Sequence, residues 1–249
     1  VIIISPAENQ TSPLRLQDLN ASSDKKSYFG PFRIAYFAPE KDLDTGQGTI
    51  ATKGNPYNFL HKACMIRVQG TTSTKRPRKN WRFQLDRKNT AGDKFKPDEN
   101  PSDQGFFIVG GEVNNKYKYS MSQGSVAVPL ICAKVDYVDS SMTHNTGGAI
   151  VFNELTKNVP ELRNPAQAKE FADGGNSVSA IKTRVSIDGF PVDIFAADSV
   201  VNPEYTDTLE DGNYVNLEYM GQYNFNNDKS KSGKVFGFDG AYTYDEEGN

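Results

Sequence analysis

Hydrophobic and polar residues alternate along two stretches in the first half of the chain. Apolar side chains occupy every second position from Cys64 to Val68 and again from Trp81 to Leu85. A two-residue period is typical of a β-strand that buries one face. The segment between the two stretches, residues 70–80, contains turn-forming residues and a proline, so we predict a hairpin with a long, basic connection.

A third strand and two helices are predicted further along the chain. Residues 129–137 have the composition of a strand. Capping oxygens at residues 139–141 precede an apolar run, and this order predicts a helix over about 141–157. The pair Gly147-Gly148 weakens the first half of that helix by about 1 kcal/mol per glycine relative to alanine. A shorter helix is predicted over residues 165–172.

Two further strand signals lie closer to the end of the sequence. Residues 184–195 alternate on both sides of Asp188-Gly189, a dipeptide that suits a two-residue hairpin turn with positive φ. Residues 214–220 predict another strand, which ends at Gly221.

Six or more strands with two helices predict an α+β fold. We expect a mainly antiparallel sheet with one or two helices packed on one face. Residues 1–27 are mostly polar with two prolines and predict an extended N-terminal arm. Residues 28–226 then form the α+β domain, and residues 227–249, which are acidic and contain glycine, form a flexible C-terminal segment.

Composition narrows the classes of function. A chain of 249 residues is long enough for one sizeable core or two modest ones. The net charge of -3 argues against a uniformly basic coat but allows a local basic stretch. Two cysteines without a CxxC pair or neighbouring histidines predict neither a disulfide scaffold nor a metal site. No run of 18 or more apolar residues occurs, so we predict no membrane-spanning segment.

One strong charge feature is the basic stretch from Lys75 to Lys88. Clustered Lys and Arg side chains bind phosphate through charge-assisted hydrogen bonds, and the candidate anion-binding residues are Lys75, Arg76, Arg78 and Arg82. The alternative is a solvated outer face of the hairpin, where Lys and Arg also block edge-to-edge pairing of sheets.

A third interpretation of the same stretch is nucleic-acid binding. Trp81 and Phe83 are then the candidates for stacking on bases, and the affinity would fall steeply with salt. The alternation places both rings toward the core, however, which argues against this interpretation.

Three passages resemble a known family when they are taken in order: MIRVQGTTSTKRPRKNWRFQL at residues 65–85, DYVDSSMTHNT at residues 136–146 and GQYNFNNDK at residues 221–229. They resemble the small-lobe half of the CotH-type spore-coat kinase family. In that family a strand ends in an Arg-x-x-Gly-x-Ser-Ser-like turn and is followed by a Pro-x-Lys-Lys strand, a helix that opens from an Asp-containing turn, and a Gly-x-Tyr strand. The same passages are similar to domains of virion proteins of tailed phages, crAss-like phages included.

The resemblance implies a kinase-small-lobe-like fold and a candidate nucleotide site. Lys79 lies near the position of the small-lobe lysine that contacts nucleotide phosphates, and Glu154 on the following helix is its candidate ion-pair partner. ATP and Mg²⁺ would be the cofactors under this interpretation, and without it we expect no cofactor.

The sequence departs from a complete kinase after Tyr223. Too few residues follow to build the helical lobe that supplies the catalytic base and the metal-binding Asp. We therefore expect a structural or interaction module from a larger phage virion protein, associated with the tail or capsid and not catalytic on its own. Its expected partners are other virion subunits or further domains of the same parent chain. The alternative is the nucleotide-binding half of an atypical protein kinase.

Overall fold

The structure is a computed structural model. The described residues are 1–7, 15–22, 24–37, 39–41, 48–50, 59–70, 72–96, 107–109, 112–114, 117, 119, 128–135, 144–156, 189–198 and 216–228.

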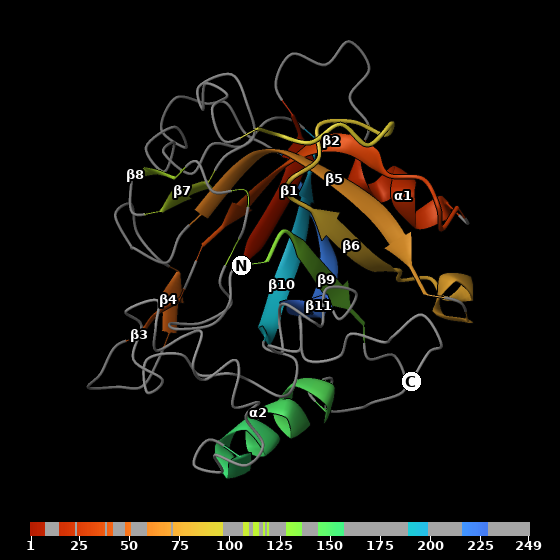
Figure 1. Ribbon diagram of the computed structural model, residues 1–249. Coiled ribbons are helices and arrows are strands. Elements are labelled where there is room, and N and C mark those ends of the chain that lie inside the picture. The colour runs from red at the N-terminus through yellow and green to blue at the C-terminus, as the bar shows by residue number, and fades with distance from the viewer. Residues whose placement is uncertain are drawn as a thin grey trace, which may run out of the picture.

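Seven strands form a sheet that closes on itself into a barrel (Figure 1). Their order around the wall is β2, β1, β10, β11, β9, β6 and β5, and β5 pairs in turn with β2. The pairing of β1 with β10 is parallel and the other pairings are antiparallel, so the sheet is mixed. The bounds are β1 (Ile2–Pro6), β2 (Phe29–Tyr36), β5 (Phe59–Gln69), β6 (Asn80–Gln84), β9 (Leu130–Lys134), β10 (Gly189–Ala197) and β11 (Leu217–Asn227).

The remaining described elements lie around this wall. The short strands β7 (Phe107–Val109) and β8 (Glu112–Asn114) extend the sheet from β5, and β3 (Pro39–Lys41) pairs with β4 (Gly48–Ile50) in a separate ribbon. There are also two α-helices and one 3₁₀ helix among the described residues, namely α1 (Leu16–Ala21), α2 (His144–Thr156) and η1 (Thr72–Lys75). Neither of the two α-helices is long and apolar enough to cross a membrane.

The predicted fold class, an α+β sheet with helices packed on one face as in a kinase small lobe, is wrong. The structure is a closed mixed barrel that is mostly sheet. Alternation along a strand reports which face is buried, but it carries no information on whether the two outer strands meet. Here they meet because β2 and β5 pair along most of their length, as Tyr36 opposite Phe59 and Ala35 opposite Leu60 show.

The first residues also differ from the expected arm. Residues 2–6 form β1, which lies between β2 and β10 in the wall. The short helix α1 follows, and its Leu16 and Leu19 are buried in the main core. Residues 1–7 and 15–22 therefore contribute to the barrel and its core, whereas the described residues 24–27 are exposed. At the other end, residues 229–249 lie outside the described residues.

The predicted hairpin of residues 64–85 is confirmed. β5 and β6 are antiparallel, with Ile66 opposite Phe83 and Val68 opposite Trp81, and all four side chains are buried. The same strands turn Arg67 and Arg82 to the outer face, opposite one another.

Aromatic residues from β6 and β11 pack against each other within the core of the barrel. Trp81 stacks on Tyr223 with ring centroids 4.8 Å apart, and Phe83 lies 5.8 Å from Phe225. All four residues are at most 1% exposed. Full burial of one such Phe contributes about 1.5–3 kcal/mol relative to an exposed side chain, so this cluster anchors the two strands to each other.

The other predicted elements have mixed outcomes. The helix predicted over 141–157 appears as α2, and the strand predicted over 129–137 appears as β9. The turn predicted at Asp188-Gly189 is wrong at its second residue, because Gly189 is the first residue of β10 and pairs with Asn226. Likewise β11 does not end at Gly221 but continues to Asn227, with an irregular register opposite Ile194 and Phe195. The helix predicted over 165–172 lies outside the described residues.

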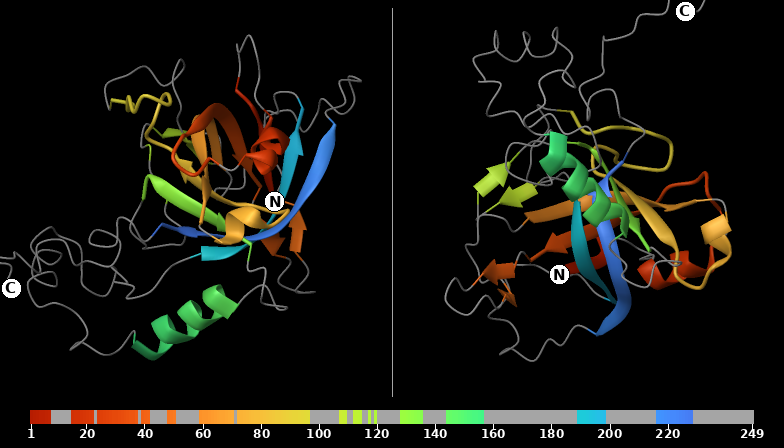
Figure 2. Two further views of the ribbon diagram at one scale, coloured as in Figure 1. Left: turned by 90° about the vertical axis from the view of Figure 1, so that its right-hand side faces the viewer. Right: turned by 90° about the horizontal axis from the view of Figure 1, so that it is seen from below.

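Helix α2 lies outside the barrel wall, beside β10 (Figures 1 and 2). Its Thr146 and Ala149 are buried, whereas most of its other described side chains are exposed. The helix is therefore attached to the barrel along one narrow side.

Candidate functional site

Helix α2 carries four of the six large hydrophobic residues that are exposed in the described part of the chain, namely Ile150, Val151, Phe152 and Leu155. Val151, Phe152 and Leu155 are 59%, 46% and 72% exposed, and Gly148 is exposed on the same side. These four positions have the spacing i, i+3, i+4 and i+7, which places them in one row along a helix. We call this row the α2 strip. Nothing lies within 4 Å of a Cβ atom built on Gly148, so the strip has an open notch at its first residue.

The orientation of α2 is opposite to that of a helix that supports a core. A helix on a globular protein normally turns its apolar row inward. In α2 the row faces outward and the inward contacts come from the smaller Thr146 and Ala149. Since a fully buried Leu or Phe side chain is stabilised by about 1.5–3 kcal/mol relative to an exposed one, and the three side chains of the strip together expose the equivalent of fewer than two whole side chains, covering the strip would contribute at most about twice that amount. The strip is suited to contact with another apolar surface.

The basic stretch does not form one site. Lys75 and Arg76 are exposed on η1 and the residue after it, while Arg78 turns toward β11. The guanidinium of Arg78 covers Gly221 so closely that a Cβ atom there would lie 2.2 Å from Nη1. Gly221 also has φ +119, a conformation that favours glycine. Arg82 instead pairs with the buried Asp228, so the four candidate anion-binding residues do not converge on one point.

Lys79 has a structural environment. Its Nζ donates hydrogen bonds to the carbonyl oxygens of Thr74 at 2.5 Å and Arg76 at 2.8 Å, and the residue is buried. The ammonium group thus ties the end of η1 to the start of β6. Glu154 is exposed on α2, and no ion pair joins it to Lys79 in the described part of the chain. The structure does not bring the two candidate nucleotide-site residues together.

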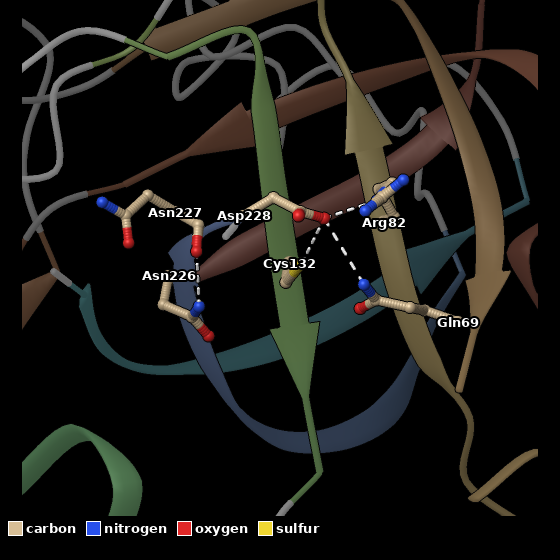
Figure 3. A network of polar contacts seen from close by, with 6 residues as sticks. All are labelled: Gln69, Arg82, Cys132, Asn226, Asn227 and Asp228. Atoms are coloured by element: carbon tan, nitrogen blue, oxygen red, sulfur yellow. Dashed lines mark hydrogen bonds and ion pairs between the residues drawn. The ribbon is translucent and has the colours of Figure 1, made fainter. Parts of the chain in front are cut away.

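A buried polar network surrounds Asp228, the residue that follows β11 (Figure 3). Its Oδ2 accepts hydrogen bonds from Arg82 Nε, from Gln69 Nε2 at 3.4 Å and from Cys132 Sγ at 3.0 Å. The donors come from β6, β5 and β9, and the Asp228 side chain is 1% exposed. One carboxylate therefore links three neighbouring strands to the end of a fourth.

Burial and charge explain the ionisation of this network. Burial alone would lower the pKa of Arg82, but the hydrogen bond and the charge of Asp228 raise it overall. Burial, reinforced by the Asp228 charge, raises the pKa of Cys132 to about 12. The thiol is consequently protonated at neutral pH, donates to the carboxylate, and lacks the thiolate character of a nucleophile.

Sequence reasoning did not single out Asp228 as a site residue. It lies in the third passage of the family resemblance, residues 221–229, but its partners are distant in sequence. Only the sheet order, which places β5, β6, β9 and β11 side by side, could have brought them together.

In the described part of the chain, the two histidines do not form part of a catalytic arrangement. His61 is fully buried; its Nε2 lies 2.7 Å from the Leu85 carbonyl oxygen, and its Nδ1 accepts a hydrogen bond from the Ala63 N–H at 3.3 Å. Burial lowers the pKa of His61 to about 4, against the smaller opposing effect of the Leu85 carbonyl. His144 is exposed at the start of α2. The described residues also contain no group of three or more His, Cys, Asp or Glu side chains that could hold a metal ion.

Comparisons of the chain with protein-family models, with curated proteins and with solved structures found no match.

Proposed function

We propose that this protein is a structural interaction module that contacts other subunits of a phage virion through the α2 strip. The observation that carries the interaction part of the proposal is the outward orientation of Val151, Phe152 and Leu155. The resemblance of the three sequence passages to domains of tailed-phage virion proteins motivates the choice of partner. The barrel then holds the helix in place through its contact with β10.

The chemistry of the strip defines the partner surface. The row contains no charged residue, and Gly148 leaves space for close approach of another backbone or a large side chain. An apolar helix or strand edge on a neighbouring subunit matches this shape. Charged groups on the partner would be left without hydrogen-bond partners against the strip, which gives the contact its selectivity.

The kinase alternative receives less support from the geometry. A lysine that contacts nucleotide phosphates needs a free ammonium group, whereas Lys79 donates to two backbone carbonyls. Asp228 is engaged by three donors instead of facing open space. Both residues have roles in holding the fold together.

Site-specific photo-crosslinking in assembled particles tests the proposal. Phage particles are purified from cells in which position 151 carries a photo-reactive phenylalanine. We expect the polypeptide to copurify with the particles and to cross-link to one other subunit. The same probe at Thr90, an exposed polar position in the described residues, is the matched control and is expected to give no such product. Particles free of the polypeptide, or equal cross-linking from both positions, would contradict the proposal.

A further inference from the structure

Three arginine side chains converge on one tyrosine on the outer face of β5 and β6. The guanidinium carbon of Arg67 lies 5.0 Å from the ring centroid of Tyr28, and that of Arg87 lies 4.3 Å from it. Tyr28, just before β2, also interacts with the side chain of Arg82. We call Tyr28, Arg67, Arg82 and Arg87 the Tyr28 cluster. The tyrosine is buried and the three arginines are half-buried.

The register of the hairpin forces these charges together. Arg67 and Arg82 are directly opposite each other in the β5–β6 pair. Like charges at opposite positions of an antiparallel pair destabilise it. Such an arrangement is retained at low cost only when negative charge lies nearby.

The negative charge within the described residues compensates only part of the cluster. Asp228 is the one carboxylate there that forms an ion pair with any of the three guanidinium groups, and its partner is Arg82. Asp86, the nearest acid in sequence to Arg87, pairs instead with Lys94 at 3.6 Å. Arg67 and Arg87 therefore keep two positive charges close to a single aromatic ring.

Part of the hydrogen-bonding capacity of Arg67 and Arg87 is also unused. The Nε–H groups of both Arg67 and Arg87 are buried, and neither has an acceptor in the described part of the chain. The one side-chain hydrogen bond recorded for Arg87 runs from Nη2 to the Thr90 carbonyl oxygen at 3.1 Å. Buried donors of this kind are normally satisfied by protein, water or a bound ion.

We propose that the Tyr28 cluster is a binding site for a phosphate group, held by Arg67 and Arg87. Two guanidinium forks supply two positive charges and several N–H donors, which match a phosphate dianion better than a single carboxylate. The Tyr28 ring restricts the two side chains, so less rotamer freedom is lost on binding. Asp228 neutralises Arg82 and thereby limits the site to the other two arginines. This site is separate from the α2 strip and does not depend on the proposed interaction function.

Calorimetric titration at low ionic strength tests the site. The probes are inorganic phosphate, a phosphoserine peptide and the same peptide without phosphate. We expect both phosphate-bearing probes to bind and the unmodified peptide not to bind. Equal affinity for the two phosphate-bearing probes identifies a free phosphate ion as sufficient, and an affinity for the peptide more than tenfold higher identifies a phosphorylated polypeptide as the source.

Matched variants locate the binding. R67Q/R87Q is expected to weaken phosphate binding at least tenfold, while R76Q, which changes an exposed arginine of the same hairpin, is expected to leave it unchanged. R67K/R87K keeps the two positive charges but removes the guanidinium forks. We expect its phosphate affinity to fall severalfold while the protein remains folded. In the unaltered protein, addition of phosphate is expected to shift the NMR signals of the Arg67 and Arg87 Nε–H groups. Absence of phosphate binding, equal binding by R67Q/R87Q, or unshifted Nε–H signals would overturn the proposal.

Discussion

The two α-helices in the described part of the chain bury their apolar residues to very different extents. α1 has six residues, yet its Leu16 and Leu19 are each 1% exposed and belong to the main core. α2 has thirteen residues and leaves Leu155 72% exposed. The short helix α1 thus contributes two leucine side chains to the core, whereas the longer helix α2 contributes little to it. The comparison indicates that α1 contributes more to the core than α2, and the exposed apolar residues of α2 are the basis of the proposed contact surface.

Substitution of Trp81 should have the largest effect on the free energy of unfolding, because Trp81 lies in the core of the barrel. Trp81→Ala removes a fully buried ring that stacks on Tyr223. We expect the free energy of unfolding to fall by about 3–5 kcal/mol, as for other buried aromatic residues. Urea unfolding measures it, with Val151→Ala on α2 as the control, for which a change of less than about 0.5 kcal/mol is expected. Similar losses in the two variants would remove the distinction between the regions.

Removal of the Asp228 carboxylate should have the next largest effect. Asp228→Ala leaves the Arg82 guanidinium and the Cys132 thiol without their acceptor. Breaking a buried ion pair by deleting one partner costs about 3 kcal/mol, and the urea midpoint should fall accordingly. The double variant R82M/D228L should recover much of the loss, since no charge is then left unpaired. If the double variant is less stable than Asp228→Ala, the ion pair is not the reason for the loss.

The pH dependence of stability provides a third test within the barrel. The pKa of buried His61 is about 4, below the ordinary value of 6.5, so the unfolded chain binds a proton that the folded protein excludes. This contribution to the free energy of unfolding should therefore be fully present above about pH 6.5. It should decrease as the pH falls toward 4, by up to about 3 kcal/mol. His61→Gln keeps a hydrogen-bonding side chain without this titration. A plot of unfolding free energy against pH should lose this component in the variant, and identical curves would contradict the assignment.

Charge on the α2 strip should have the smallest effect on stability and a large effect on assembly. V151D/L155D alters only exposed positions, so the unfolding free energy should change by less than about 0.5 kcal/mol. Its incorporation into particles, measured by quantitative mass spectrometry, should fall at least tenfold because carboxylates would face an apolar partner. T90D/A91D adds the same charge at exposed positions and serves as the control. Normal incorporation of V151D/L155D would show that the strip is not the contact surface.

Local elements of this fold could be predicted from the sequence, but the long-range pairing of the strands could not. The inward positions of β5 and β6 follow from the two-residue period, and α2 follows from the run of apolar residues between Ala149 and Leu155. Closure depends on the pairing of β2 with β5 and on the parallel contact between Ile3 of β1 and Phe195 of β10. These partners are far apart along the chain, and local periodicity carries no information about them.

The site residues show the same limit. The sequence identifies Lys79 and Arg82 as cations, but the role of each depends on its partner in the fold. Lys79 donates to two nearby backbone carbonyls, and Arg82 donates to Asp228. Arg67 was not selected at all, because an isolated arginine on a strand has no local signal. Its importance depends on Tyr28 and Arg87, which approach it only in the folded sheet.

Hydrogen exchange of α2 in the free and assembled states tests the central claim most directly. In the free protein, a helix with two glycines and a narrow attachment should exchange its amide hydrogens much faster than the barrel strands. In purified particles, we expect protection of residues 148–155 to rise at least tenfold, with β5 and β6 unchanged. Equal exchange of α2 in both states, with new protection elsewhere, would contradict the assignment of the α2 strip as the docking surface.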